Sequence, residues 1–228
     1  MVCASYTDPR LSAVYDALNG PGPDGAFYID LAGEASKSIL DMGCGTGWLA
    51  CELAAHGHHL TGADPAVAML DIARSRSGGD KVIWINVAAA DLSIETRFDL
   101  IIMTGHVFQV FLADQDVSAV LHVLRRHLAP GGRLAFETRN PSVRKWEEWT
   151  PAKTSKRVEV AGLGLVEVRH DTRSVVGPLV TYETHFGFGG TDVVVTADTL
   201  RFMNREELAT FLADCGSRTE SWPRRRDN

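Results

Sequence analysis

The sequence predicts an α/β fold in which a doubly wound, mostly parallel sheet carries helices on both faces and receives an antiparallel β insertion. Short apolar runs alternate with stretches of helical periodicity between residues 38 and 142, and this alternation is the signature of parallel strands joined by helices. A glycine-rich segment separates the first of these runs from the first helical stretch. After Asn140 the apolar residues recur at every second position instead, which is typical of antiparallel strands.

Each element of the parallel region has its own sequence signal. The fourth apolar run contains no polar interruption apart from Asp99 and is therefore expected to be a central strand. Pro65 suits the first turn of a helix, and Asp114 is a candidate helix cap. The expected strands are 38–42, 59–63, 81–87, 98–103 and 133–138, and the expected helices are 47–56, one after Pro65, and one from Asp114 that ends at Pro130-Gly-Gly132.

The second half of the chain is expected to hold two or three antiparallel strands within residues 156–202. Tyr182 and Phe186 share one face of these strands, with His170, His185, Trp146 and Trp149 also in this region. Such a face could form a lid over a site or a hydrophobic dimer surface, and the sequence does not separate the two. Helical periodicity returns from Asn204, a candidate cap, to Cys215.

Composition and charge narrow the function classes. The chain has 228 residues, 45% of them apolar and 23% charged, with a net charge of -6. These values fit one globular domain with an insertion and give no general affinity for nucleic acids or anionic membranes. The N-terminus lacks a secretory signal, and the four cysteines have no paired spacing, so we expect reduced thiols in the cytoplasm. We expect no metal site, because His56, His58 and His59 are interpreted as a solvated loop.

The glycine-rich segment is the strongest functional signal. Gly43-x-Gly45-x-Gly47 follows a strand that ends near Asp41, and a second acidic residue, Asp64, ends the next strand 21 positions after Gly43. Glycines in such a turn let the backbone approach a ligand closely, and the second carboxylate is placed to accept both hydroxyls of a ribose. A dinucleotide fingerprint would need its third glycine at position 48, where Trp48 stands instead. The spacing therefore argues against NAD.

At this point the sequence resembles the class I S-adenosylmethionine-dependent methyltransferases, particularly small-molecule and uncharacterised bacterial members. The resemblance extends from about residue 15 to residue 140 and rests on four motifs in order. It implies a Rossmann-like fold, S-adenosyl-L-methionine as the cofactor and a small molecule as the methyl acceptor. The motifs are Leu40-Asp-Met-Gly-Cys-Gly-Thr-Gly47, Gly62-Ala-Asp-Pro65 with Met69, Ala90-Asp91-Leu92, and Leu128-Ala-Pro-Gly-Gly-Arg-Leu134.

The resemblance also implies roles for individual residues. The methionine end of the cofactor would lie on Asp41, Gly43, Cys44 and Gly45. The ribose would bind Asp64, while the adenine would lie near Pro65, Met69, Asp91 and Leu92. Thr104, Gly105 and His106 would face the sulfonium. His106 is the candidate general base, with a purely structural role in lining the cofactor site as the alternative. Glu137, Arg139 and Asn140 end the fifth strand and could bind the acceptor or form a surface loop.

These expectations divide the chain into four segments. They are a helical lead-in or cap (1–37), a cofactor-binding core (38–142), the inserted strands (143–202), and a final helix with a short C-terminal strand at 217–222 (203–228). In such enzymes two strands usually follow the last helix, so their shortage predicts a six-stranded sheet or a swapped homodimer. No membrane or nucleic-acid partner is expected, because the Asn/Asp-Pro-Pro-Tyr-type motif is absent. A non-catalytic S-adenosylmethionine-binding module and an NAD-dependent oxidoreductase are the alternatives.

Overall fold

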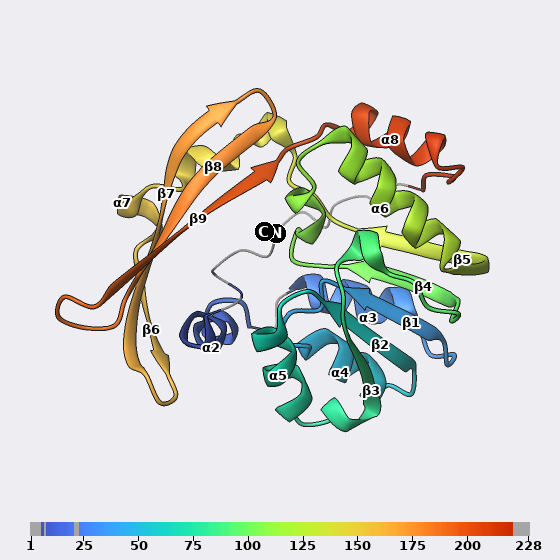
Figure 1. Cartoon of the computed structure of the whole chain (residues 1–228), viewed down its shortest axis with the longest axis horizontal. Coiled ribbons are helices and arrows are strands. Elements are labelled where there is room, and N and C mark those ends of the chain that lie inside the picture. The colour runs from blue at the N-terminus through green and yellow to red at the C-terminus, as the bar shows by residue number, and fades with distance from the viewer. Residues whose placement is uncertain (1–5, 7, 21–22, 221–228) are drawn as a thin grey trace.

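The computed structural model describes residues 6, 8–20 and 23–220, and these residues form two separate sheets (Figure 1). The first has the order β3-β2-β1-β4-β5 with every pair parallel, and the second has the order β6-β7-β8-β9 with every pair antiparallel. The predicted fold class is confirmed. The parallel strands are β1 Ser38–Met42, β2 His59–Asp64, β3 Val82–Asn86, β4 Phe98–Met103 and β5 Leu128–Phe136.

Helices connect these strands and precede them. The cap of α6 differs from the prediction, because Ala113 occupies the cap position and Asp114 is the first helical residue. Asp116 accepts a hydrogen bond from the backbone of Ala113 instead. The α-helices are α2 Pro9–Leu18, α3 Pro23–Ala32, α4 Trp48–Ala55, α5 Val67–Ser75, α6 Asp114–Arg126, α7 Pro151–Thr154 and α8 Arg205–Asp214. The 3-10 helices are η1 Gly79–Lys81, η2 Ala89–Asp91, η3 Val107–Val110, η4 Pro141–Val143 and η5 Lys145–Glu148.

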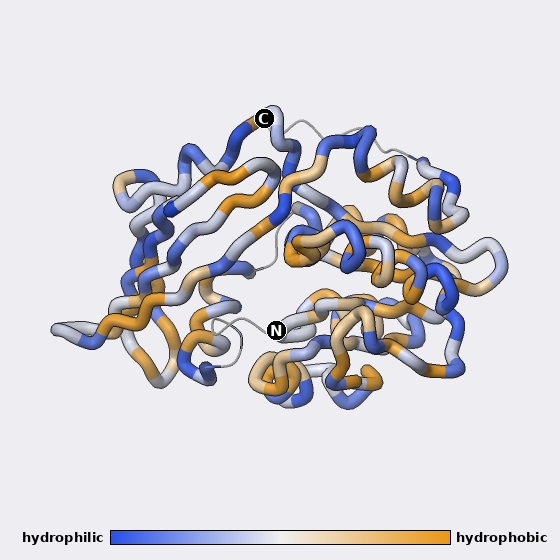
Figure 2. Tube along the Cα trace, turned by 45° about the horizontal axis from the view of Figure 1, so that its top comes forward, coloured by the Kyte–Doolittle hydropathy of each residue, from blue (hydrophilic) through white to orange (hydrophobic). Residues whose placement is uncertain are grey.

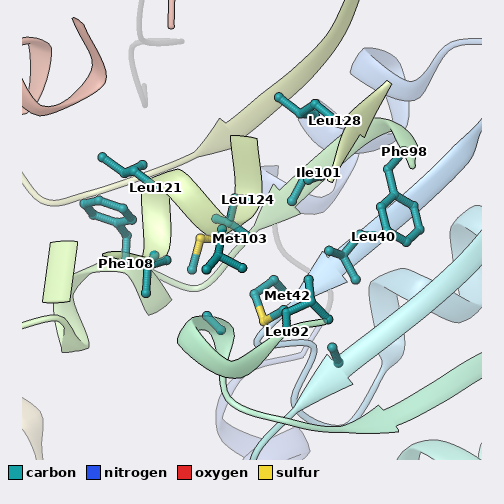
Figure 3. Packing of buried hydrophobic residues seen from close by; sticks show 14 of the residues in the cluster. Leu40, Met42, Leu92, Phe98, Ile101, Met103, Phe108, Leu121, Leu124 and Leu128 are labelled. Atoms are coloured by element: carbon teal, nitrogen blue, oxygen red, sulfur yellow. The ribbon is translucent and has the colours of Figure 1, made fainter. Parts of the chain in front are cut away.

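The parallel sheet has a hydrophobic core on each face because neighbouring strand residues point to opposite sides. On one face Leu40 and Ile101 pack with Leu121 and Leu124 of α6, and Figure 3 shows these side chains converging. On the other face Ile39, Leu100 and Ile102 pack with residues of α3 and α4. The sheet is therefore covered on both sides, as the apolar character of β4 predicts.

The fifth strand differs from its expected form. Pro130-Gly-Gly132 does not end the preceding helix but lies inside β5, where the pairing with β4 shifts between Phe98 and Leu100. Gly132 makes this possible, because a Cβ atom there would lie 2.7 Å from the carbonyl oxygen of Phe98. The glycine pair thus marks a bulge in a strand, although the same residues are also typical of a turn.

The inserted sheet contains four strands, so the prediction of two or three was wrong. They are β6 Lys156–Val160, β7 Gly164–Val176, β8 Leu179–Gly187 and β9 Val193–Arg201. β6 has no clear sequence signal because it is short and its Lys156, Arg157 and Glu159 are polar. One face of this sheet packs through Val166, Val168 and Phe186 onto Leu11 and Val14 of α2. Figure 2 shows hydrophobic and hydrophilic stretches mixed along this sheet, as expected where only one face is covered.

The predicted C-terminal strand is wrong over its described part. Residues 217–220 have no regular secondary structure, and positions 221–222 lie outside the described residues. The parallel sheet of the described chain has five strands rather than six, with β5 at its edge. In the same part of the chain, no helix has the length and apolar character needed to span a membrane.

Gly47 is the position in the glycine loop where a side chain would cost the most. Its φ angle is +74°, and a Cβ atom would lie 2.4 Å from Trp84 Cη2 and 2.8 Å from Ala73 Cβ. We expect Gly47→Ala to lower the free energy of unfolding by about 2–5 kcal/mol, from backbone strain and overpacking together. Gly57→Ala is the matched control, because Gly57 has φ +91° and a Cβ atom placed on it would have no neighbouring atom within 4 Å.

Urea unfolding of both variants tests this expectation. The control should lose only the backbone contribution of about 1–2 kcal/mol. Equal losses in Gly47→Ala and Gly57→Ala would contradict the packing argument.

Candidate functional site

The functional candidates gather at the carboxyl ends of four parallel strands. The ends of β1 and β2 are adjacent, with Asp41 opposite Gly62 in the pairing, and β1 also pairs with β4. The order of the sheet reverses direction between β1 and β4, which is where open α/β sheets bind their ligands. The loops after β1, β2, β4 and β5 therefore share one edge of the sheet.

The glycine loop at this edge is tightly enclosed. Gly43, Gly45 and Gly47 have φ angles of +78°, +53° and +74°, in the left-handed region that favours glycine. A Cβ atom on Gly43 would lie 2.7 Å from Val107 Cγ2, so the loop also runs close to the segment after β4. Gly43 and Gly47 thus serve both backbone geometry and close packing, whereas Gly45 serves backbone geometry.

Asp64 ties the loops after β1 and β2 together. Its Oδ2 accepts a hydrogen bond from Gly45 N at 3.0 Å and its Oδ1 accepts one from Ala66 N at 2.8 Å. The side chain is only 9% exposed, and burial raises its pKa above the ordinary value. A carboxylate has about four lone-pair positions, so two remain for hydroxyl donors.

Asp41 is the most unusual side chain of the site. It is 1% exposed, and its buried Oδ1 has no hydrogen-bond partner in the described structure. Burial, followed by the charges of Asp64 and Glu137, raises its pKa from 3.8 to about 7. A buried carboxylate without a partner is costly, and a cationic ligand would relieve that cost.

Glu137 joins the end of β5 to the loop after β4. Its Oε1 accepts a hydrogen bond from His106 N at 3.3 Å, and its Oε2 accepts one from the hydroxyl of Tyr28. Burial raises the pKa of Glu137, and it also raises the pKa of Tyr28. His106 has φ +62°, a left-handed conformation that is uncommon for residues other than glycine and that clusters at functional sites.

Removal of the Tyr28 hydroxyl gives a test of this arrangement. Tyr28→Phe should lower the free energy of unfolding by about 1–3 kcal/mol near pH 8, because Glu137 loses a buried donor. The loss should shrink near pH 5, because the hydrogen bond from Tyr28 lowers the pKa of Glu137 and a protonated Glu137 needs it less. Urea unfolding at the two pH values measures both losses. A loss of the same size at both pH values would contradict the premise that Glu137 is ionised near pH 8.

Comparison with known proteins identifies the kind of domain that holds this site. The family model described as "Methyltransferase domain" matches residues 39–132, the segment that holds the glycine loop, Asp64 and β4. Residues 39–132 match a methyltransferase domain. The demethylmenaquinone methyltransferase of Clavibacter sepedonicus is 33% identical over 136 residues, which are 56% of this chain and 54% of the relative. The chain spans about half the length of the curated relatives it matches.

Solved structures share the fold over most of the chain. The CcbJ methyltransferase from Streptomyces caelestis has a TM-score of 0.72 and 22% identity, with 90% of this chain and 84% of that chain covered. CalS10 with bound S-adenosylmethionine, an amino pentose methyltransferase from Micromonospora echinaspora, has a TM-score of 0.67 and 24% identity, with 90% and 86% covered. The coverage extends beyond the methyltransferase domain into the antiparallel sheet.

The other predicted residues occupy the same edge with different exposures. Pro65 follows β2 directly, and Met69 on α5 is 1% exposed. Thr104 follows β4 directly. At η2 Asp91 is exposed, whereas Leu92 is buried in the core with Leu40 and Met42. Cys44 is half-buried, and burial raises the pKa of its thiol.

Trp48 and His58 both pack against neighbouring residues. A Cβ atom on Gly25 of α3 would lie 2.6 Å from the Trp48 ring, so the position that a dinucleotide fingerprint gives to glycine holds a helix contact. His58 is buried, not solvated as predicted, whereas His56 and His59 are exposed. Within the described residues, no group of three His, Cys, Asp or Glu side chains could hold a metal ion.

Helix α2 adds residues that the sequence did not mark as functional. A Cβ atom on Gly45 would lie 3.8 Å from Tyr15 Cε1, and one on Gly105 would lie 3.8 Å from the Tyr15 hydroxyl. Burial, followed by the charge of Asp64, raises the pKa of Tyr15 to about 12. Asp16 holds α2 in place by accepting a hydrogen bond from Thr46 Oγ1 at 2.5 Å. Tyr15 had no distinguishing signal, because its spacing is that of any apolar helix residue.

The antiparallel sheet turns its covered face toward the methyltransferase domain. Tyr182 on this face contacts Trp149 with ring centroids 4.8 Å apart, and Trp146 contacts Phe202 at 4.6 Å. His170 Nδ1 lies 2.9 Å from Thr184 Oγ1 on the same face. Arg201, at the end of β9, donates to Asp114 Oδ1 at 2.6 Å and so anchors the sheet to α6.

Proposed function

We propose that this chain is an S-adenosylmethionine-dependent methyltransferase that acts on a small-molecule acceptor. The observation that carries the proposal is Asp41, a buried carboxylate with an unpartnered oxygen beside the glycine loop of the methyltransferase domain. The methionine part of S-adenosylmethionine ends in an ammonium group, and an ammonium is the donor that such an oxygen lacks. The residues present therefore fit this cofactor.

The glycine loop and Asp64 give the predicted contacts their strongest structural support. The backbone of Gly43, Cys44 and Gly45 would hold the methionine end, since no Cβ atoms at the two glycines obstruct it. Asp64 keeps lone pairs for the two ribose hydroxyls. The adenine would lie against Pro65 and Met69, with Asp91 accepting from its amino group, the Leu92 backbone meeting its edge, and Thr104 near the sulfonium.

In the proposed mechanism the protein forms no covalent bond with the cofactor or the acceptor. S-adenosylmethionine, when bound, supplies a methyl group already activated by its sulfonium charge. The chain positions the acceptor and keeps water away, and the carboxylates of Asp41, Asp64 and Glu137 favour a cation at this edge. His106, fixed through its backbone by Glu137, would take a proton from an acceptor that must lose one.

We assign the segment 143–202 to acceptor enclosure as a lid over the core of residues 38–142. The apolar face of its sheet packs on α2, so this face is not free to form a dimer surface. A homodimer remains an expectation, as does a cytoplasmic location. The acceptors named for relatives support a small molecule, since one acts on demethylmenaquinone and another on an amino pentose.

Methyl transfer from labelled S-adenosylmethionine into a deproteinised cell extract tests the proposal. We expect label to appear in a discrete small-molecule fraction with the wild-type chain and not with a variant that lacks Asp64. Binding of S-adenosylhomocysteine without transfer into any fraction would favour a non-catalytic binding module instead.

A further inference from the structure

Arg139 is a cation that the proposed chemistry does not use. It lies in the segment that follows β5, two residues after Glu137, and it is half-buried. No carboxylate of the described residues lies within 4.0 Å of its guanidinium, although Arg76 and Arg201, whose side chains are also largely shielded from solvent, each have one. Burial lowers the pKa of Arg139, and the more distant charges of Tyr182 and Glu137 only partly offset this.

The guanidinium is nevertheless held in a fixed position. Arg139 Nη1 donates to Gln109 Oε1 at 2.8 Å, and Gln109 has no exposed surface. Gln109 in turn donates to the backbone oxygen of Arg201 at 3.0 Å, and its own backbone N donates to His106 O at 3.0 Å. The guanidinium also lies over the ring of Trp149, 5.4 Å from its centroid. Arg139 is thus oriented from both the His106 loop and the lid.

Its remaining donors are available to a ligand. One hydrogen bond satisfies one of the five N–H donors of a guanidinium, and the other donors have no partner among the described residues. None of these nitrogens is among the fully enclosed polar atoms without a partner. A residue that only connected Gln109 and Trp149 would not need a positive charge, because partial burial of that charge costs free energy.

We propose that Arg139 is a specificity-determining residue that binds a carboxylate of the methyl acceptor. The planar fork of a guanidinium matches a carboxylate through two parallel hydrogen bonds. The half-buried rings of Trp149 and Tyr182 beside it favour a planar, apolar body next to that carboxylate. This inference rests on the proposed function only for calling the ligand a methyl acceptor, because the anion site itself is defined by Arg139 and Gln109.

Benzoate and its neutral counterpart benzamide are suitable probes. Their dissociation constants are measured by ligand-observed NMR on the full chain, with and without saturating S-adenosylhomocysteine. The wild-type chain should bind benzoate about tenfold more tightly than benzamide, and Arg139→Gln should remove this preference. Arg139→Lys should keep part of it because the charge remains. Arg133→Gln is the matched control, since Arg133 lies on β5, six residues before Arg139, with an exposed side chain.

The outcomes separate this inference from the proposed function. Equal affinities of the wild-type chain for benzoate and benzamide would overturn the inference. So would a loss of S-adenosylhomocysteine affinity in Arg139→Gln with the benzoate preference intact, because the guanidinium would then hold the carboxylate of the cofactor. Failure of the wild-type chain to bind S-adenosylhomocysteine would refute the proposed function. A preference for benzoate over benzamide, measured in the absence of S-adenosylhomocysteine, would still support an anion site at Arg139.

Discussion

Asp41→Asn should make the protein more stable and at the same time weaken its affinity for S-adenosylhomocysteine. The substitution removes a buried carboxylate that has an unpartnered oxygen and two acidic neighbours. One unit of pKa corresponds to about 1.4 kcal/mol, and part of the elevation is shared with Asp64 and Glu137, so we expect a gain of about 2 kcal/mol near pH 8. The lost bond to the ligand ammonium should weaken binding between about tenfold and a hundredfold.

The pH dependence of stability provides an internal check on Asp41. Its pKa is about 7 in the folded protein and near 3.8 ordinarily, so between these values the folded chain holds a proton that the unfolded chain has released. The contribution of Asp41 to the free energy of unfolding therefore falls as the pH rises through this window and is constant above it. The gain from Asp41→Asn should be roughly twice as large at pH 8 as at pH 5.5.

Urea unfolding and calorimetric titration of S-adenosylhomocysteine measure the two effects separately. A variant that is destabilised at both pH values would show that the buried carboxylate has a structural partner. Unchanged ligand affinity would show that Asp41 does not face the ammonium.

Asp64→Ala should cause the largest loss of ligand affinity of any single substitution at the site. The change removes the acceptors for the ribose hydroxyls and also the acceptors for Gly45 N and Ala66 N, which hold the loops after β1 and β2 together. We expect S-adenosylhomocysteine to bind at least about a hundredfold more weakly, and the free energy of unfolding to fall by about 1–3 kcal/mol.

Asp71→Ala is the matched control for this substitution. Asp71 lies on α5, is exposed and pairs with Arg74 on the surface. Its removal should change the free energy of unfolding by less than about 0.5 kcal/mol and leave the affinity unchanged. Affinity losses of similar size in the two variants would mean that Asp64→Ala acts through the loss of a negative charge from the protein and not through ribose binding.

The parallel sheet could be predicted closely because its signals are local. β1 and β4 begin and end at the predicted residues, since each is a short apolar run bounded by polar or glycine residues. Asp64 and the glycine loop were recognisable because close backbone approach to a ligand restricts residue type and spacing. The signals at these positions are therefore local in the sequence.

The rest of the site depends on contacts between distant residues. Tyr28 meets Glu137 across 109 positions and Arg139 meets Gln109 across 30, and no periodicity marks such pairs. β6 is hard to recognise because its polar outer residues hide the alternation, and Pro130-Gly-Gly132 resembles a helix end because a bulge uses the same residues as a turn. Tertiary structure decides these features.

Calorimetric titration of the wild-type chain with S-adenosylhomocysteine and with NAD tests the central claim most directly. We expect one molecule of S-adenosylhomocysteine to bind per chain and to raise the melting temperature, while NAD does neither. The Asp41→Asn variant should show the weakened binding described above under the same conditions. Binding of NAD in place of S-adenosylhomocysteine, or binding of neither, would contradict the assignment of this site to a methyl donor.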